Sequence, residues 1–175
     1  MTDAELMLAS AAGDENAFSE IVSKFSDVLL NFFLRQGVSH ADGQDLAQRT
    51  LLRLWRYRAK YRPTAKFTTF LFILARQESV DFFRAEGRRR NLMDGFERES
   101  AVRSDATPAA LSFSGEGVRR AVARLEPAWR DVVELGFFQD LPYAEVAEIL
   151  GIPVGTVKSR MFNALRKLRE TLHER

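Results

Sequence analysis

The chain has 175 residues, of which 46% are hydrophobic and 29% charged, a composition typical of soluble globular proteins and sufficient for at most two small domains. It contains no Cys and only two His, which lie far apart, so disulfides and thiolate chemistry are excluded and there is little basis for a metal site or a catalytic dyad. The net charge is +2, no apolar run is long enough to span a bilayer, and the acidic amino terminus argues against a secretory signal, so we expect a cytoplasmic binding protein without cofactor or membrane insertion.

The first part of the chain predicts four helices and then a linker. Apolar residues recur at helical spacing over about 2–12, 14–33, 41–57 and 69–84, and Gly37 is placed to end the second helix. Pro63 interrupts the pattern, so residues 60–66 are expected to form an extended loop. The 14 Phe residues are expected mainly to fill the core of this first domain, residues 1–87. Residues 88–115 collect Gly, Pro, Ser and Arg without periodicity, which predicts a flexible linker.

The second domain, residues 116–175, has the pattern of a helix-turn-helix. Two short helices from about Val118 to Leu135 are followed by helices over 143–150 and 154–173. Gly151 can adopt the left-handed conformation that ends the first of this last pair, and Pro153 suits the start of the second. The expected fold class is all-α: two small helical domains joined by a flexible linker, the C-terminal one containing a helix-turn-helix.

The last helix divides into an apolar stripe and a polar face. A core stripe runs from Val157 to Leu172. The opposite face carries hydrogen-bond donors, a small residue and the aromatic Phe162, which suit contacts to phosphates and base edges. An ordinary helical hairpin with a cationic surface would leave Phe162 exposed without cause.

Charge is segregated along the chain despite the small net value. Residues 49–90 carry 12 Lys/Arg against 3 Asp/Glu, and residues 154–175 carry 6 against 2. The intervening stretches are acidic, with 2 Lys/Arg against 8 Asp/Glu in 1–48 and 6 against 11 in 91–153. One basic block alone could be a solvated helix face, but two blocks that coincide with the basic loop and the last helix indicate nucleic-acid binding.

Three sequence blocks in order resemble the extracytoplasmic-function (ECF) sigma factors, the compact two-domain members of the bacterial sigma-70 family. They are DLAQ at 45–48 with LWR at 54–56, FTTFLFILAR at 67–76, and LPYAEVAEILGIPVGTVKSR at 141–160. The resemblance implies a factor, not an enzyme, that binds core RNA polymerase and directs promoter-specific initiation. It implies that the first domain opens and reads the −10 element and that the second reads the −35 element.

The resemblance also implies which residues contact each partner. The helix from Asp42 should bind the β′ clamp helices of the polymerase, and the β flap is a further expected contact. The residues expected to bind core polymerase are Asp42, Asp45, Gln48, Arg49 and Arg53. Those expected at the −35 element are Gly155, Thr156, Lys158, Ser159, Phe162, Asn163 and Arg166.

For the −10 element, the loop and the helix after it are expected to capture a flipped base of the non-template strand. Stacking on aromatic rings and neutralisation of the DNA backbone suit that task, at roughly 1–3 kcal/mol per stacked base. The expected residues are Lys60, Tyr61, Arg62, Lys66, Phe70, Arg76, Gln77, Asp81 and Arg84. Phe70 and Gln77 stand where Trp and Asn are common in the family.

The predicted polymerase-binding helix is less acidic than the family pattern, with Gln44 and Arg49 at positions where acids are usual. Against a basic partner surface, this difference lowers steering and affinity. One hypothesis is that phosphorylation at Thr50 restores negative charge. The resemblance also implies an anti-sigma factor as a partner, and the long linker permits both domains to be clamped.

Two other classes of function remain as alternatives. A stand-alone helix-turn-helix regulator that binds duplex DNA without polymerase would explain the last two helices equally well. It gives no reason for an acidic surface beside a basic aromatic loop. An enzyme would need paired acid and base groups in a pocket, and the sequence offers no catalytic His or Cys arrangement and no Gly-rich phosphate loop.

Overall fold

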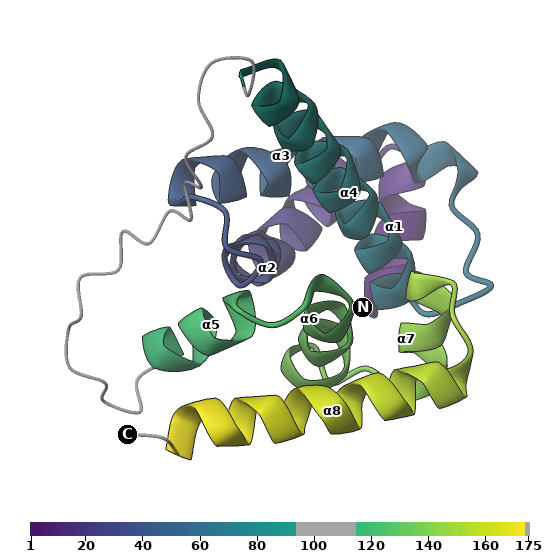
Figure 1. The fold of residues 1–175 in the computed structure, drawn as a ribbon. Coiled ribbons are helices and arrows are strands. Elements are labelled where there is room, and N and C mark those ends of the chain that lie inside the picture. The colour runs from purple at the N-terminus through teal and green to yellow at the C-terminus, as the bar shows by residue number, and fades with distance from the viewer. Residues whose placement is uncertain (94–114, 174–175) are drawn as a thin grey trace.

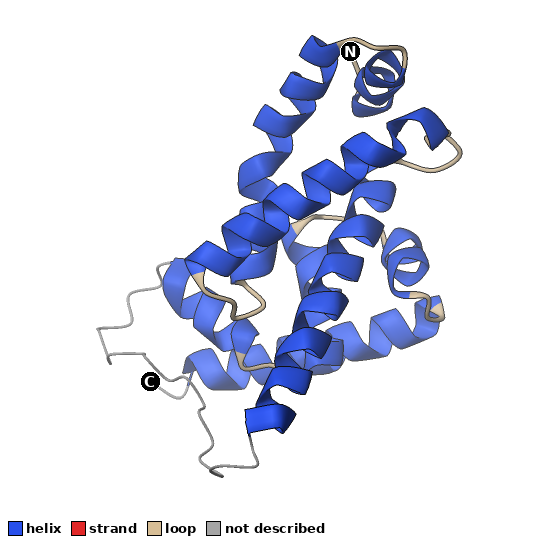
Figure 2. Ribbon diagram, turned by 90° about the horizontal axis from the view of Figure 1, so that it is seen from above, coloured by secondary structure: helices blue, strands red, loops and turns tan. Residues whose placement is uncertain are grey.

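The computed structural model describes residues 1–93 and 115–173, and in these two stretches every regular element is helical (Figures 1 and 2). The all-α fold class is therefore confirmed. The first domain contains α1 (Asp3–Ala11), α2 (Glu15–Leu34), α3 (His40–Tyr57), the 3-10 turn η1 (Arg58–Lys60) and α4 (Phe67–Met93). The second contains α5 (Gly115–Ala123), α6 (Pro127–Val133), the π-helical turn η2 (Glu134–Phe138), α7 (Tyr143–Leu150) and α8 (Val154–His173).

Local sequence signals set the helix starts of the first domain. Thr2 and Glu5 form a capping box, with the Thr2 amide donating to the Glu5 carboxylate at 2.6 Å. The Asp14 carboxylate accepts from the Asn16 amide at 2.9 Å and so caps α2. These caps satisfy amides that the helix itself leaves without partners.

Phenylalanine fills the core of the first domain, as predicted. Phe33 and Phe72 are fully buried, and the rings of Phe32 and Phe72 lie 5.4 Å apart between α2 and α4. The wide apolar faces of α2 and α4 thus meet through aromatic side chains, which bury large areas per residue.

Helix α4 is longer than the sequence pattern predicts. It begins at Phe67 and continues to Met93, past the expected end near Arg84, so that residues 88–93, assigned to the linker, are helical. The extension contains no Pro, and Glu86 and Arg89 form an ion pair at 3.6 Å one turn apart, which supports helix in an exposed segment. The rest of the expected linker, 94–114, lies outside the described residues.

The second domain confirms the predicted helix-turn-helix and adds a π turn. Gly151 has φ +65°, and the Ile152 amide donates to the Ala147 carbonyl, which closes α7 before α8 starts. Where one helix from Pro127 to about Leu135 was expected, α6 passes at Glu134 into η2. No helix in the described stretches is long and apolar enough to cross a bilayer.

The two domains pack against each other. Figure 1 shows α5–α8 as a lower group beneath α1–α4, with α7 against α4. Asp131 of α6 lies 3.5 Å from Arg76 of α4. The contacts across this boundary determine which of the expected site residues are accessible to a partner molecule.

Candidate polymerase and promoter interfaces

The exposed face of α8 carries the residues expected to contact the −35 element. Val157, Met161 and Leu168 anchor the other face of the helix in the core of the second domain. Phe162 is 67% exposed, although large apolar side chains are usually covered. Gly155, Lys158, Ser159 and Arg166 are exposed, and Thr156 and Asn163 half-buried.

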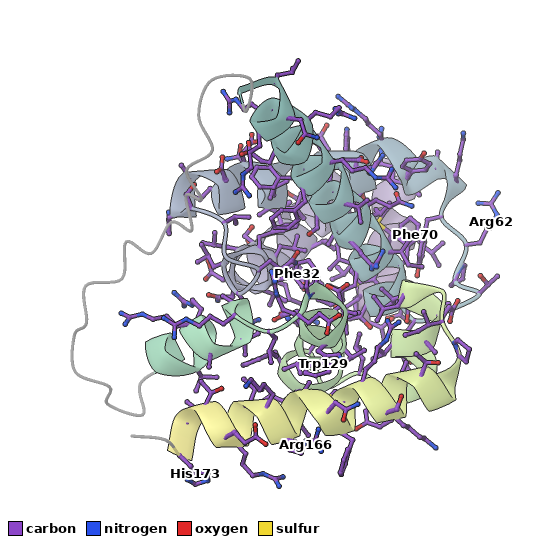
Figure 3. All side chains as sticks on the ribbon, in the orientation of Figure 1. Phe32, Arg62, Phe70, Trp129, Arg166 and His173 are labelled. Carbon is purple, nitrogen blue, oxygen red and sulfur yellow. The ribbon has the colours of Figure 1, made fainter. Side chains whose placement is uncertain are left out.

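The chemistry of this face suits contact with duplex DNA. The face is cationic and lies on the side of α8 away from the first domain, where Figure 3 labels Arg166. The Ser159 hydroxyl donates to the Thr156 carbonyl at 3.2 Å, which fixes its position on the first turns of the helix. A helix that presents donors and one aromatic ring on an open face can enter a major groove.

Residues expected at the −10 element follow α4 in a stripe. Gln77, Asp81 and Arg84 are exposed, and Phe70 and Arg76 are half-buried. Four of these residues, Arg76, Gln77, Asp81 and Arg84, line a cleft of about 400 Å³ together with Arg53 of α3 and Ile149 of α7. The structure thus brings the expected stripe together but places part of the second domain beside it.

The basic loop before α4 divides into exposed cations and a buried ring. Lys60, Arg62 and Lys66 are exposed, and Arg62 projects from the edge of the molecule in Figure 3. Tyr61 is only 4% exposed, and its ring packs 5.5 Å from that of Phe70.

In this conformation Tyr61 is therefore not accessible to DNA. Its ring belongs to the core, and burial, with a smaller contribution from Asp3, raises the pKa of its hydroxyl. Tyr61 instead helps to hold Phe70 at the start of α4. Its place in the predicted loop 60–66 favours exposure, but the ring turns inward towards that of Phe67, and the two ring centroids lie 6.2 Å apart.

The exposed face of α3 carries the residues expected to bind core polymerase. Leu46, Leu51 and Leu54 are buried, whereas Asp42, Asp45, Gln48 and Arg49 are exposed. The Ser39 hydroxyl donates to the Asp42 carboxylate at 2.9 Å. The same face also exposes Leu52, an apolar residue that the sequence analysis did not single out and that follows Gln48 by one turn.

Arg53 differs from the other residues of this set. It is half-buried and lies 3.2 Å from the Glu78 carboxylate, which joins α3 to α4. Arg53 therefore holds two helices together in addition to bordering the cleft beside α4.

The structure speaks against phosphorylation at Thr50. The residue has no exposed surface, and its hydroxyl donates to the Leu46 carbonyl at 2.8 Å. A kinase cannot reach this oxygen while α3 is packed, and a phosphate would not fit there without disrupting the core.

The ion pairs at the domain boundary were not predicted, although Lys66 and Arg76 were expected to contact DNA. Arg35 donates to both carboxylate oxygens of Glu134, at 2.6 and 2.7 Å, across 99 positions of sequence. Arg76 lies 3.5 Å from Asp131, and Lys66 lies 2.9 Å from Glu145. No local pattern could reveal these pairs, since spacing along one helix carries no information about partners in another domain.

Burial changes the titration of the acids at this boundary. Burial raises the pKa of Asp131, against the opposing influence of Arg76 and Arg130. Burial likewise raises the pKa of Glu134, although the bonds from Arg35 act in the opposite direction. Removing the cations beside them would therefore leave two buried carboxylates uncompensated, which lowers the stability of the closed arrangement.

In comparisons with known proteins, two family models match separate stretches of the chain. The family model described as Sigma-70 region 2 matches residues 21–89, and that described as Sigma-70, region 4 matches residues 121–170. The ECF RNA polymerase sigma factor RpoE of Cereibacter sphaeroides is 30% identical over 158 residues, which is 90% of this chain and 87% of that protein. SigL of Mycobacterium tuberculosis, also an ECF RNA polymerase sigma factor, is 31% identical over 168 residues, which is 94% of each chain.

Solved structures show the same architecture. The sigma factor RpoE of Bartonella quintana, in complex with the anti-sigma factor NepR, superposes with a TM-score of 0.73 at 26% identity, over 89% of this chain and 96% of that one. CnrH in complex with the cytosolic domain of CnrY superposes with a TM-score of 0.74 at 24% identity, over 97% of this chain and 96% of that one, which is a likeness of fold.

The two helical domains, with sigma-70 regions 2 and 4 in that order, define an RNA polymerase sigma factor. The chain belongs to the ECF RNA polymerase sigma factors. The alternative of a stand-alone helix-turn-helix regulator is not favoured, because region 2 is present together with region 4.

Proposed function

We propose that this sigma factor reads two promoter elements with two separate faces while docked on core polymerase. The exposed face of α8 contacts the −35 element, and the stripe on α4 with the basic loop before it opens and reads the −10 element. The single observation that carries the proposal is the open face of α8, where Phe162 and Lys158 are exposed beside Ser159.

The exposed face of α3 is proposed as the surface for the β′ clamp helices. Asp42, Asp45 and Gln48 lie on it together with Leu52. An apolar side chain ringed by polar ones has the composition of the centre of a protein interface. The second domain is proposed to engage the β flap.

We also propose that an anti-sigma factor regulates this chain. Support comes from the Bartonella quintana relative, which was solved with such a partner. The chain is proposed to work in the cytoplasm as an initiation factor that supplies no catalytic group of its own.

The proposal is tested by transcription with purified core polymerase. Adding this chain should start RNA at positions not used by core alone, and sequencing the transcripts maps them. Lys158→Ala should lower initiation at these promoters about tenfold, because it removes a contact to DNA. Lys167→Ala is the matched control, since it removes the same charge from an exposed position on the flank of α8.

A second pair of variants tests α4. Gln77→Ala should impair opening of the −10 element, measured by permanganate reactivity of unpaired thymines. Asn16→Ala removes an amide from an exposed position on α2 and should have no effect. Transcription starts that are identical with and without the chain would overturn the proposed function.

A further inference from the structure

The contact between the two domains has a consistent electrostatic polarity. Three carboxylates of the second domain, on α6, η2 and α7, pair with three cations of the first. The pairs are Asp131 with Arg76 at 3.5 Å, Glu134 with Arg35 at 2.6 Å, and Glu145 with Lys66 at 2.9 Å. The second domain therefore presents acidic groups to the basic groups of the first domain, as the phosphates of a DNA backbone would.

The pair of Arg35 and Glu134 is the most enclosed of the three. The side chain of Glu134 is 1% exposed and that of Arg35 15%. The Gln139 amide donates to the same carboxylate at 3.0 Å, and the Arg35 guanidinium lies 4.3 Å from the centroid of the Phe138 ring. Because the cation beside this buried carboxylate comes from the other domain, separating the domains must hydrate Glu134 or leave it uncompensated.

The backbone around Glu134 is shaped for this contact. Glu134 begins the π turn η2, and π turns inside helices occur frequently at functional sites. The Arg130 guanidinium donates to the Gln36 carbonyl at 2.8 Å, which ties α6 to the end of α2. The closed arrangement thus rests on bidentate and directional bonds in addition to surface charge.

The same contact covers part of the α4 stripe. Arg76 and Lys66, both expected to contact DNA phosphates, are paired with carboxylates. Gln77 and Asp81 face a cleft of about 400 Å³ that Ile149 of α7 helps to line. A cleft of that volume suits a small molecule and does not admit a strand of several nucleotides.

We propose that the second domain is an internal competitor of promoter DNA, with Asp131, Glu134 and Glu145 holding the molecule closed over the −10 face of α4. The domains must separate before that face can bind DNA. The inference rests on the proposed function of α4, and it adds a regulated closed state held by this chain alone.

The absence of Cys from the chain allows a direct test with an engineered disulfide. A Cβ placed on Gly37 lies 3.9 Å from the Cβ of Ala123, across the domain boundary and within the range for a disulfide. In the full-length Gly37→Cys/Ala123→Cys variant, oxidation should link the domains in the absence of DNA and polymerase. The strain of a side chain at φ +87° is present in both redox forms, so each preparation is its own control.

Comparing initiation by the oxidised and the reduced form shows whether the closed state inhibits initiation. The oxidised form should initiate at least tenfold less than the reduced form, and reduction should restore initiation. Equal initiation by both forms would overturn the closed state as an inhibitor while leaving the proposed function intact. Failure of the reduced form and of the unmodified chain alike would overturn the proposed function itself.

Cross-linking yield measures how much of the chain is closed. Glu145→Gln, added to the cysteine pair, should lower the yield several-fold because Lys66 loses its partner. Glu148→Gln, at an exposed carboxylate of the same helix, should not change it. A Gly37→Cys/Glu170→Cys pair controls for random collision, and a yield no greater than in this control would refute the closed state.

The ion pair can also be tested by exchange of its charges. Arg35→Glu should lower the cross-linking yield, and Arg35→Glu/Glu134→Arg should recover part of it, with circular dichroism reporting whether each variant is folded. Recovery in the double variant requires the two side chains to be in contact. If each substitution only lowered the general stability, the losses of the two single variants would add in the double variant. Additive losses would contradict the assigned pair.

Discussion

Asp45 and Arg49 form an ion pair one turn apart on α3, with 2.9 Å between carboxylate oxygen and guanidinium nitrogen. Both side chains are more than half exposed on the face proposed to bind core polymerase. The pair therefore places a cation beside one of the acids that this face would offer to a basic partner. Its own energy is small, at most about 1 kcal/mol for exposed groups.

We predict that Arg49→Gln strengthens binding to core polymerase about two- to fivefold, because the Asp45 carboxylate is then free to meet the partner. Asp45→Asn should weaken binding by a similar factor. Competition against a labelled copy of the chain measures both. Glu20→Gln, on the exposed part of α2, is the control for a change of net charge. Weaker binding by Arg49→Gln would show that the arginine itself contacts the polymerase.

Thr50 should behave as a core residue. Thr50→Ala removes a buried hydroxyl together with its bond to Leu46 and is expected to lower the free energy of unfolding by about 1–2 kcal/mol. Thr50→Glu buries a carboxylate without a partner and should cost about 3 kcal/mol or more. Urea unfolding followed by circular dichroism measures both values. A stable Thr50→Glu variant that binds core polymerase more tightly would revive the phosphorylation hypothesis.

Phe162 should matter for DNA and hardly at all for folding. Because its ring is largely exposed, Phe162→Ala should change the free energy of unfolding by no more than about 0.5 kcal/mol. Initiation from promoters that depend on a −35 element should fall about tenfold. A large loss of stability would mean that the ring packs within the domain, and unchanged initiation would remove it from the interface.

Tyr61 should affect stability in a manner that depends on pH. In the described part of the chain its hydroxyl is buried and has no hydrogen-bond partner, so Tyr61→Phe should be neutral or slightly stabilising at pH 7. Burial holds the pKa of the folded protein's Tyr61 above its ordinary value near 10. Above pH 10 the unfolded chain therefore loses this proton first, and stability falls as the pH rises towards the folded pKa.

The difference between wild type and Tyr61→Phe isolates this contribution. All other ionisable groups are common to both proteins, so their contributions cancel in this difference. The free energy of unfolding of the wild type should fall relative to that of Tyr61→Phe as the pH rises above 10. Parallel curves would indicate that the Tyr61 hydroxyl is accessible to water.

Much of this fold could be predicted from the sequence because its signals are local. The left-handed Gly151 and the two faces of α8 are properties of neighbouring residues, and the structure confirms them. The extension of α4 past Arg84 was missed because helix continues through an exposed, charged segment that carries no apolar periodicity.

The features that escaped prediction depend on contacts between distant segments. Tyr61 lies in a loop, but the inner surfaces of α1, η1 and α4 decide that its ring is buried. The sequence analysis did not single out Glu134, and its contact with Arg35, which comes from the other domain, explains its burial. The positions expected to contact polymerase and DNA stay predictions, since they require a partner.

The shared polarity of the three ion pairs has a consequence for the response of this factor to ionic strength. Salt weakens a protein–DNA complex because binding releases condensed counterions from the phosphates. It also screens the attraction between the acidic and basic groups that close this molecule, most strongly at the exposed Lys66. A rise in salt concentration therefore weakens both the contact between the two domains and the contact between the protein and DNA. Promoter occupancy should decline less steeply with the logarithm of the salt concentration than the number of phosphate contacts alone would produce.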